Sequence, residues 1–399
     1  MMDDAMLALA VMLLRVGHAI WLSGSVRSKN AGSMAMRLLL DLAVVSLALW
    51  AIGAAFVPAA DPHSPPRLFD ARAMFGFSPN AVSAFLLLPF LMVITGAVHG
   101  AVAERMRLTP ILVLVGVTAG VVFPLIVQLL THLRPKFVVL DNSLGLACVI
   151  GGTAALIGTI MAGARKGKFN RDLSVNFVPG HNVVLQLIGV MVVIAGWAAL
   201  WSIFAGSTVN VLLCVSAAVL AAAVFGRQRF GKVDTGLVIA GAIGGLCATS
   251  GGIAGMQPTP TGAQLMPTYA AVVSGALAGV IVPWVLMQLE MRLRLDDVAG
   301  TGAAHLVGGF VGLVFGAIFR EGSWGSKFQT LSGHLLLASI AIAAAALLTW
   351  VVFWAFSRRG HLRVSESAEY DGADLSELDL NAYPDFQQTM IKSHHLREL

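Results

Sequence analysis

The chain has 399 residues, of which 57% are hydrophobic and only 12% are charged. Soluble domains carry about 25% charged residues, so this chain cannot cover a water-facing surface, and a soluble enzyme, a disordered chain and a fibrous protein are excluded. The net charge of +5 does not indicate a nucleic-acid partner, because the basic residues stand in short loops between apolar runs. The composition predicts a multi-pass protein of the plasma or inner cell membrane, with the lipid bilayer as its surroundings.

Eleven apolar runs approach or exceed the roughly 20 residues that a membrane-spanning helix needs. They predict an all-α membrane protein with eleven transmembrane helices over residues 1–357, followed by a tail at residues 358–399. In chain order the predicted spans are Met6–Leu22, Leu38–Val57, Val82–Val102, Pro110–Leu130, Leu144–Gly163, Val183–Ser207, Val209–Gly226, Thr235–Gly255, Tyr269–Leu289, Gly302–Phe319 and Leu331–Phe356.

The loops alternate in charge along the chain. One set, which includes the start of the tail, is much richer in Lys and Arg than the other set. Positively charged loops stay on the cytoplasmic side, so we expect a cytoplasmic tail and an N-terminus outside. An odd number of spans is required for this orientation, and eleven satisfies it.

Two charged residues, Arg15 and Asp41, stand inside the first two predicted spans. A charge inside a membrane costs several kcal/mol unless it is paired or hydrated. In an antiparallel hairpin the two residues would differ in depth by roughly 6–9 Å, which a long arginine side chain can bridge. We expect an ion pair between them or, alternatively, contacts across a subunit interface. His18 and His99 are also intramembrane polar groups, and the sequence assigns no role to either.

Four stretches, taken in order, resemble the ammonium transporter (Amt/Rh) family. They are Gly24–Asn30, Thr95–Met106, Gly180-His181-Asn182 with Gly196-Trp197, and Asp296-Asp297 with His305 and Gly308–Gly312. The tail from Leu362 to Tyr383 is similar to the family's cytoplasmic C-terminus. The resemblance implies two inverted halves of five helices around a pore, an extra outer helix, and a homotrimer with one pore in each protomer. It implies ammonium or ammonia as the substrate. The residues themselves show no metal-binding cluster, and no cofactor is expected.

The resemblance also assigns roles in the pore. His305 matches the second of two pore histidines, and an intramembrane imidazole is a functional candidate on physical grounds alone. Phe90 matches the gate phenylalanine. Ser207 is a candidate for the hydroxyl that recruits ammonium, with Ser202 as a competitor, and Trp201 is a candidate replacement for a missing outer aromatic residue. Asp141 matches an aspartate that orders the outer vestibule.

Two positions depart from the family pattern. Val149, with Cys148 beside it, stands where the first pore histidine is expected, so His305 lacks that partner. Leu130 stands where an outer tryptophan is expected, and leucine cannot supply the 0.5–2 kcal/mol that a cation gains over an aromatic face. Two hypotheses follow. The first is a transporter or channel for ammonium or ammonia. The second is an ammonium sensor that signals through its tail to a cytoplasmic regulator or output domain. No catalytic constellation is recognisable, so an enzyme is not expected.

Overall fold

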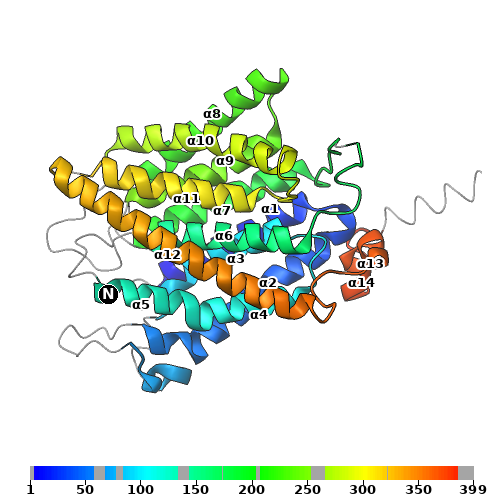
Figure 1. The fold of residues 1–399 in the computed structure, drawn as a ribbon, viewed down its shortest axis with the longest axis horizontal. Helices are drawn as coiled ribbons and strands as arrows, with labels where there is room; N and C mark the ends of the chain where they lie inside the picture. The colour runs from blue at the N-terminus through cyan, green and yellow to red at the C-terminus, as the bar shows by residue number, and fades with distance from the viewer. Residues whose placement is uncertain are drawn as a thin grey trace, which may run out of the picture.

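The computed structural model describes residues 4–57, 68–77, 84–133, 143–172, 174–203, 207–252, 266–320 and 322–384. These residues form a bundle of long helices that share one approximate direction (Figure 1). In chain order the helices are α1 (Asp4–Ser25), α2 (Ala31–Ala51), α3 (Leu88–Ala101), α4 (Leu108–Val117), α5 (Phe123–Leu133), α6 (Ser143–Ala162), α7 (Val183–Ile203), α8 (Thr208–Phe230), α9 (Thr235–Ala248), α10 (Thr268–Met291), α11 (Thr301–Ile318), α12 (Trp324–Ser357), α13 (Glu366–Asp371) and α14 (Ala373–Leu378).

Ten helical stretches among the described residues are long and apolar enough to cross a membrane. One of them is continuous from α4 to α5, because a π-helical segment, Thr118–Val122, joins the two helices. The shorter apolar helix α9 is extended by a 3-10 turn, Thr249–Gly252. Together these elements correspond to the eleven predicted runs, which confirms the all-α membrane architecture.

Close pairs of helices form the centre of the bundle. In α1 and α7, a Cβ atom on Gly189 would lie 2.2 Å from the backbone nitrogen of Trp21. In α6 and α11, a Cβ atom on Gly152 would lie 2.3 Å from the backbone nitrogen of Leu306. Glycine therefore lets these backbones approach where lipid offers no hydrophobic driving force. The first span, α1, therefore packs on the sixth span, α7, and the fifth span, α6, packs on the tenth span, α11. Two inverted halves of five helices produce this pairing.

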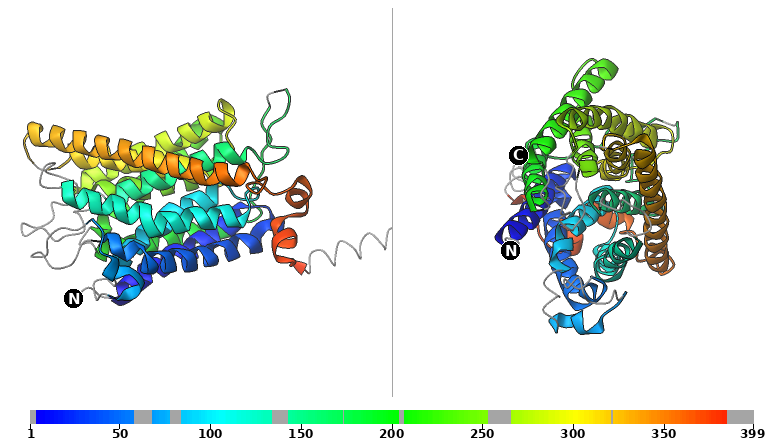
Figure 2. Two further views of the ribbon diagram at one scale, coloured as in Figure 1. Left: turned by 60° about the horizontal axis from the view of Figure 1, so that its bottom comes forward. Right: turned by 90° about the vertical axis from the view of Figure 1, so that its left-hand side faces the viewer.

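Helix α12 lies along the outside of the bundle (Figure 2, right). Its buried residues recur mainly every three or four positions, for example Leu337, Ala341, Ala345 and Thr349. This spacing forms one stripe along a helix, and the stripe packs on α4, α6 and α11. The opposite face stays apolar and exposed, as Trp350 illustrates, so it suits contact with lipid.

The first helix begins at one end of the bundle, and α13 and α14 lie at the other (Figure 2, left). We call the latter the tail end. The loops from α1 to α2, from α3 to α4 and from α6 to α7 all contact the tail there. The tail end is therefore the place where the polar segments of the chain gather.

Candidate functional site

His305 lies in α11 and is buried, with 1% of its surface exposed. Its Nδ1 atom is 2.8 Å from the carbonyl oxygen of Thr301. A carbonyl only accepts, so Nδ1 donates and Nε2 keeps its lone pair. Nε2 has no hydrogen-bond partner among the described residues. The hydroxyl of Thr301 donates to the carbonyl of Ala97 at 2.7 Å and so fastens this part of α11 to α3.

The residues at the expected position of the first histidine are apolar or thiol side chains. Val149 is fully buried, in one apolar cluster with Leu313 and Ala338. Cys148 is also buried, as is Cys247 in α9. Val149 therefore offers no hydrogen-bonding side chain in this part of α6.

Phe90 lies in α3 with 1% of its surface exposed. Its ring centroid is 6.2 Å from that of Phe123 in α5, and the two planes are inclined by 41°. The two rings therefore form a buried aromatic pair between non-adjacent segments of the chain. The sequence singled out Phe90 but not Phe123, because an aromatic residue in an apolar run carries no signal of its contacts.

The other predicted pore residues differ in their surroundings. Trp201 is buried in α7, and its Nε1 atom has no hydrogen-bond partner among the described residues. Ser207 accepts a hydrogen bond from the backbone nitrogen of Asn210 at 3.2 Å, so it serves as the N-cap of α8. Ser202 donates to the carbonyl of Ala199 at 2.7 Å. Asp141 and the side chain of Leu130 lie outside the part of the chain that the structure describes.

Arg15 and Asp41 form an ion pair with 2.7 Å between Nη2 and Oδ2, and both side chains are buried. This confirms the predicted pair. Thr95 in α3 accepts from Arg15 at 2.8 Å and donates to Asp41 at 2.9 Å. His99, one turn further along α3, is 3.2 Å from the other oxygen of Asp41. The pair is thus part of a polar cluster that joins α1, α2 and α3. The spacing of Thr95 and His99 on one face of α3 is the signal that sequence reasoning missed.

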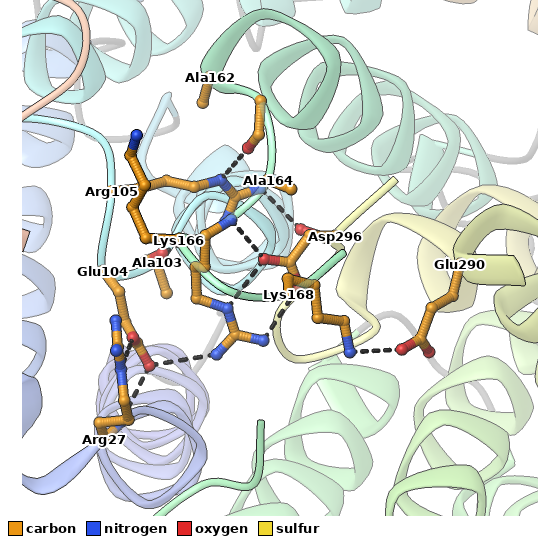
Figure 3. A network of polar contacts seen from close by, with 12 residues as sticks. Arg27, Ala103, Glu104, Arg105, Ala162, Ala164, Lys166, Lys168, Glu290 and Asp296 are labelled. Atoms are coloured by element: carbon orange, nitrogen blue, oxygen red, sulfur yellow. Dashed lines mark hydrogen bonds and ion pairs between the residues drawn. The ribbon is translucent and has the colours of Figure 1, made fainter. Parts of the chain in front are cut away.

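A network of charged residues occupies the tail end (Figure 3). Glu104 accepts from the backbone nitrogen of Arg27 at 2.9 Å and contacts Arg165 at 3.3 Å. Arg165 also makes two hydrogen bonds to the carboxylate of Asp296, at 2.9 and 3.0 Å. Burial alone would raise the pKa of Asp296, but the hydrogen bonds and charge of Arg165 outweigh it and lower the pKa to about 2. The network joins the ends of α1, α3, α6 and α11.

Asp297 lies immediately before α11, the helix that carries His305. Its Oδ2 atom accepts from the backbone nitrogen of Ala303 at 3.0 Å, and its Oδ1 atom has no partner among the described residues. Burial raises the pKa of Asp297 to about 6, because removal from water disfavours the charged carboxylate. Asp297 therefore positions the first turn of α11 at the expense of a buried, incompletely bonded carboxylate.

The tail docks directly on these loops. Asp374 accepts from the backbone nitrogens of Gly32 and Ser33 at 3.1 and 2.6 Å, so it caps the start of α2. Glu377 is 2.7 Å from Arg37, also in α2. The tail therefore binds the same helix that carries Asp41.

The sequence matches the profile of the Ammonium Transporter Family over residues 5–383. The chain belongs to this family. Among curated relatives, the ammonium transporter Amt2 of Archaeoglobus fulgidus is 29% identical, over 94% of this chain and 86% of the relative. The ammonium transporter Amt1 of Haloferax mediterranei is 28% identical, over 94% of this chain and 77% of the relative.

Solved structures share the fold. One described as a sensor Amt protein superimposes with a TM-score of 0.81 at 23% identity, over 93% of this chain and 96% of the other. Mep2 of Saccharomyces cerevisiae superimposes with a TM-score of 0.73 at 20% identity, over 92% of this chain and 88% of the other. These likenesses agree with the helical architecture described above.

Proposed function

We propose that this member of the Ammonium Transporter Family carries ammonium or ammonia through a pore in each protomer, with His305 as the principal polar group of the lumen. The observation that carries the proposal is the buried imidazole of His305, whose Nε2 atom has no hydrogen-bond partner among the described residues. A polar group without a partner inside a membrane bundle is costly and marks a site for a polar ligand. The substrate follows from family membership.

The remaining predicted residues have roles along this path. Phe90, together with Phe123, acts as the aromatic gate, since two buried rings exclude water from the lumen. Trp201 supplies an aromatic face for the cation, which is worth 0.5–2 kcal/mol. Ser207 and Asp141 belong to the outer entrance, and Val149 keeps the lumen apolar opposite the gate. These assignments rest on the family motif and on the burial of the described side chains.

We further propose that the tail end faces the cytoplasm, that the N-terminus is outside, and that the chain assembles as a homotrimer in the cell membrane. The basic loops support the orientation, because several of them, including those of Arg27 and Arg165, lie at the tail end. Labelling of introduced surface cysteines from either side of the membrane tests it.

The sensor remains the second candidate, and two observations favour it. Val149 leaves the lumen without the family's paired histidines, and Asp374 and Glu377 connect the tail to α2. A sensor would bind ammonium without conducting it and would signal through the tail to a cytoplasmic regulator.

Current measurements on proteoliposomes after an ammonium pulse separate the two functions. The transporter predicts a current in the wild type that falls at least tenfold in His305→Ala. His334→Ala is the matched control, because this buried imidazole of α12 also contacts a carbonyl, that of Leu313, through Nδ1. A wild type without current at any gradient, in which ammonium still protects the tail from protease, would support the sensor. A wild type with neither response would refute both.

A further inference from the structure

Helix α1 contributes a second buried imidazole, that of His18, with 1% of its surface exposed. Its Nδ1 atom is 2.6 Å from the carbonyl oxygen of Leu14, four residues earlier in the same helix. His305 makes the same type of contact with the carbonyl four residues before it. Two helices from the two halves of the bundle thus present an imidazole held in the same way.

His18 and the turn of α11 that holds His305 lie against the same stretch of α3. A Cβ atom on Gly96 of α3 would lie 2.5 Å from Nε2 of His18, and one on Gly100 would lie 2.6 Å from the side chain of Thr301. Thr301 is the residue whose carbonyl holds His305. The glycines of α3, one turn apart, therefore let His18 and the base of His305 approach the same helix.

The hydrogen bonds decide what this pair can bind. Each Nδ1 faces a carbonyl oxygen, which only accepts, so each Nδ1 carries the proton and each Nε2 is an acceptor. Two acceptors cannot bond to one another, and neither Nε2 has a partner among the described residues. The pair is therefore suited to a donor placed between the rings rather than to a proton shared by them.

We propose that His18 and His305 form a two-acceptor binding site for ammonium, with His18 supplying from α1 the second imidazole that α6 lacks. The proposal rests on the proposed function and identifies the ligand groups of that same pore. Ammonium donates four N–H groups, whereas Na⁺ and K⁺ donate none, so hydrogen bonding to two lone pairs selects ammonium. Arg15, about one turn before His18 in α1, does not oppose a positive ligand strongly, because Asp41 pairs with it at 2.7 Å.

Ligand-dependent melting of the purified full chain in detergent tests this site, because a ligand that binds the folded state raises the melting temperature according to its affinity. We expect a saturable rise with ammonium chloride and none with sodium chloride at equal ionic strength. His18→Leu and His305→Leu should each weaken ammonium binding at least tenfold, whereas His334→Leu should bind as the wild type does. The double variant should bind ammonium no more weakly than either single variant, because each single substitution already removes the same two-imidazole site.

Folding is controlled separately, by elution as a single species and by melting without ligand. If His18→Leu fails to fold, His18→Asn keeps a polar side chain and takes its place in the assay. Normal ammonium affinity in a folded His18 variant, alongside loss in His305→Leu, would overturn the paired site and leave the proposed function intact. A wild type that neither binds nor conducts ammonium would overturn both.

Discussion

Arg15 and Asp41 form a buried ion pair between the first two helices of the bundle, with 2.7 Å between Nη2 and Oδ2. Thr95 contacts both partners and His99 contacts Asp41, so the pair also holds α3. Among the described residues, each charge is compensated by the other and by the side chains of Thr95, His99 and Met92, whose sulfur accepts from Arg15 at 2.8 and 3.0 Å. Three helices are therefore joined through one carboxylate.

Asp41→Asn should destabilise the protein by about 3–5 kcal/mol, because it leaves the Arg15 guanidinium buried without a counter-charge. The double variant Arg15→Met, Asp41→Leu should recover part of this loss, because it removes both charges. Thermal or denaturant unfolding in detergent measures the difference. The control is Asp70→Asn, whose pair with Arg72 is exposed to solvent, so little or no change in stability is expected there. Equal stability of Asp41→Asn and the wild type would contradict this interpretation.

Glu377→Gln should loosen the tail. Glu377 pairs with Arg37, whose side chain is only 3% exposed, so the variant leaves a largely buried guanidinium short of its partner. We expect faster trypsin cleavage after Arg358 and Arg359, by roughly threefold or more, since about 1 kcal/mol of docking energy changes the open population by a factor of five. Glu366→Gln is the matched control, because its pair with Lys166 is largely exposed. Identical cleavage of the two variants would show that the Arg37 pair does not hold the tail.

Gly152→Ala should separate α6 from α11. The added Cβ would lie 2.3 Å from the backbone nitrogen of Leu306, the neighbour of His305, so the two helices must move apart. The expected cost is about 1–3 kcal/mol, with a lower ammonium flux because His305 shifts with its helix. Gly333→Ala in α12 is the control, since apart from its own stretch of helix no described atom lies within 4 Å of its added Cβ. That control should unfold at or above the wild-type temperature.

Asp297→Asn should change how stability depends on pH. Burial raises the pKa of Asp297 from 3.8 to about 6, so the folded protein binds this proton more tightly than the unfolded chain does. The protonated carboxyl therefore contributes fully to the free energy of unfolding below pH 4. This contribution, up to roughly 3 kcal/mol, is lost as the pH rises through 6. The asparagine keeps an acceptor for Ala303 and does not titrate.

The variant should therefore unfold at a higher temperature than the wild type at pH 7.5, and the difference should shrink toward pH 4. The titration of Asp296 does not interfere with this comparison. Its pKa is lowered to about 2, so its contribution is lost only as the pH falls below about 4. Parallel melting curves for Asp297→Asn and the wild type from pH 4 to 7.5 would refute the assignment.

The sequence by itself determined the number and order of the membrane spans, and it offered the ion pair of Arg15 with Asp41 as one of two alternatives. The physical reason is that lipid forces every spanning segment to be long, apolar and helical, and makes an unpaired charge costly. These constraints act on each segment separately, so they can be recognised without knowing which helices touch. The family motif placed His305 for the same reason, as a polar residue inside an apolar helix.

Only the tertiary structure decided which side chains meet. Three contacts join segments that are far apart in the chain: Phe123 with Phe90, His99 with Asp41, and His18 with α3. In the sequence, each of these residues is simply one residue of an apolar helix. The direction of a side chain around its helix depends on the packing of several helices at once. Glycine contacts such as Gly96 against His18 set that packing, and no local pattern specifies their partners.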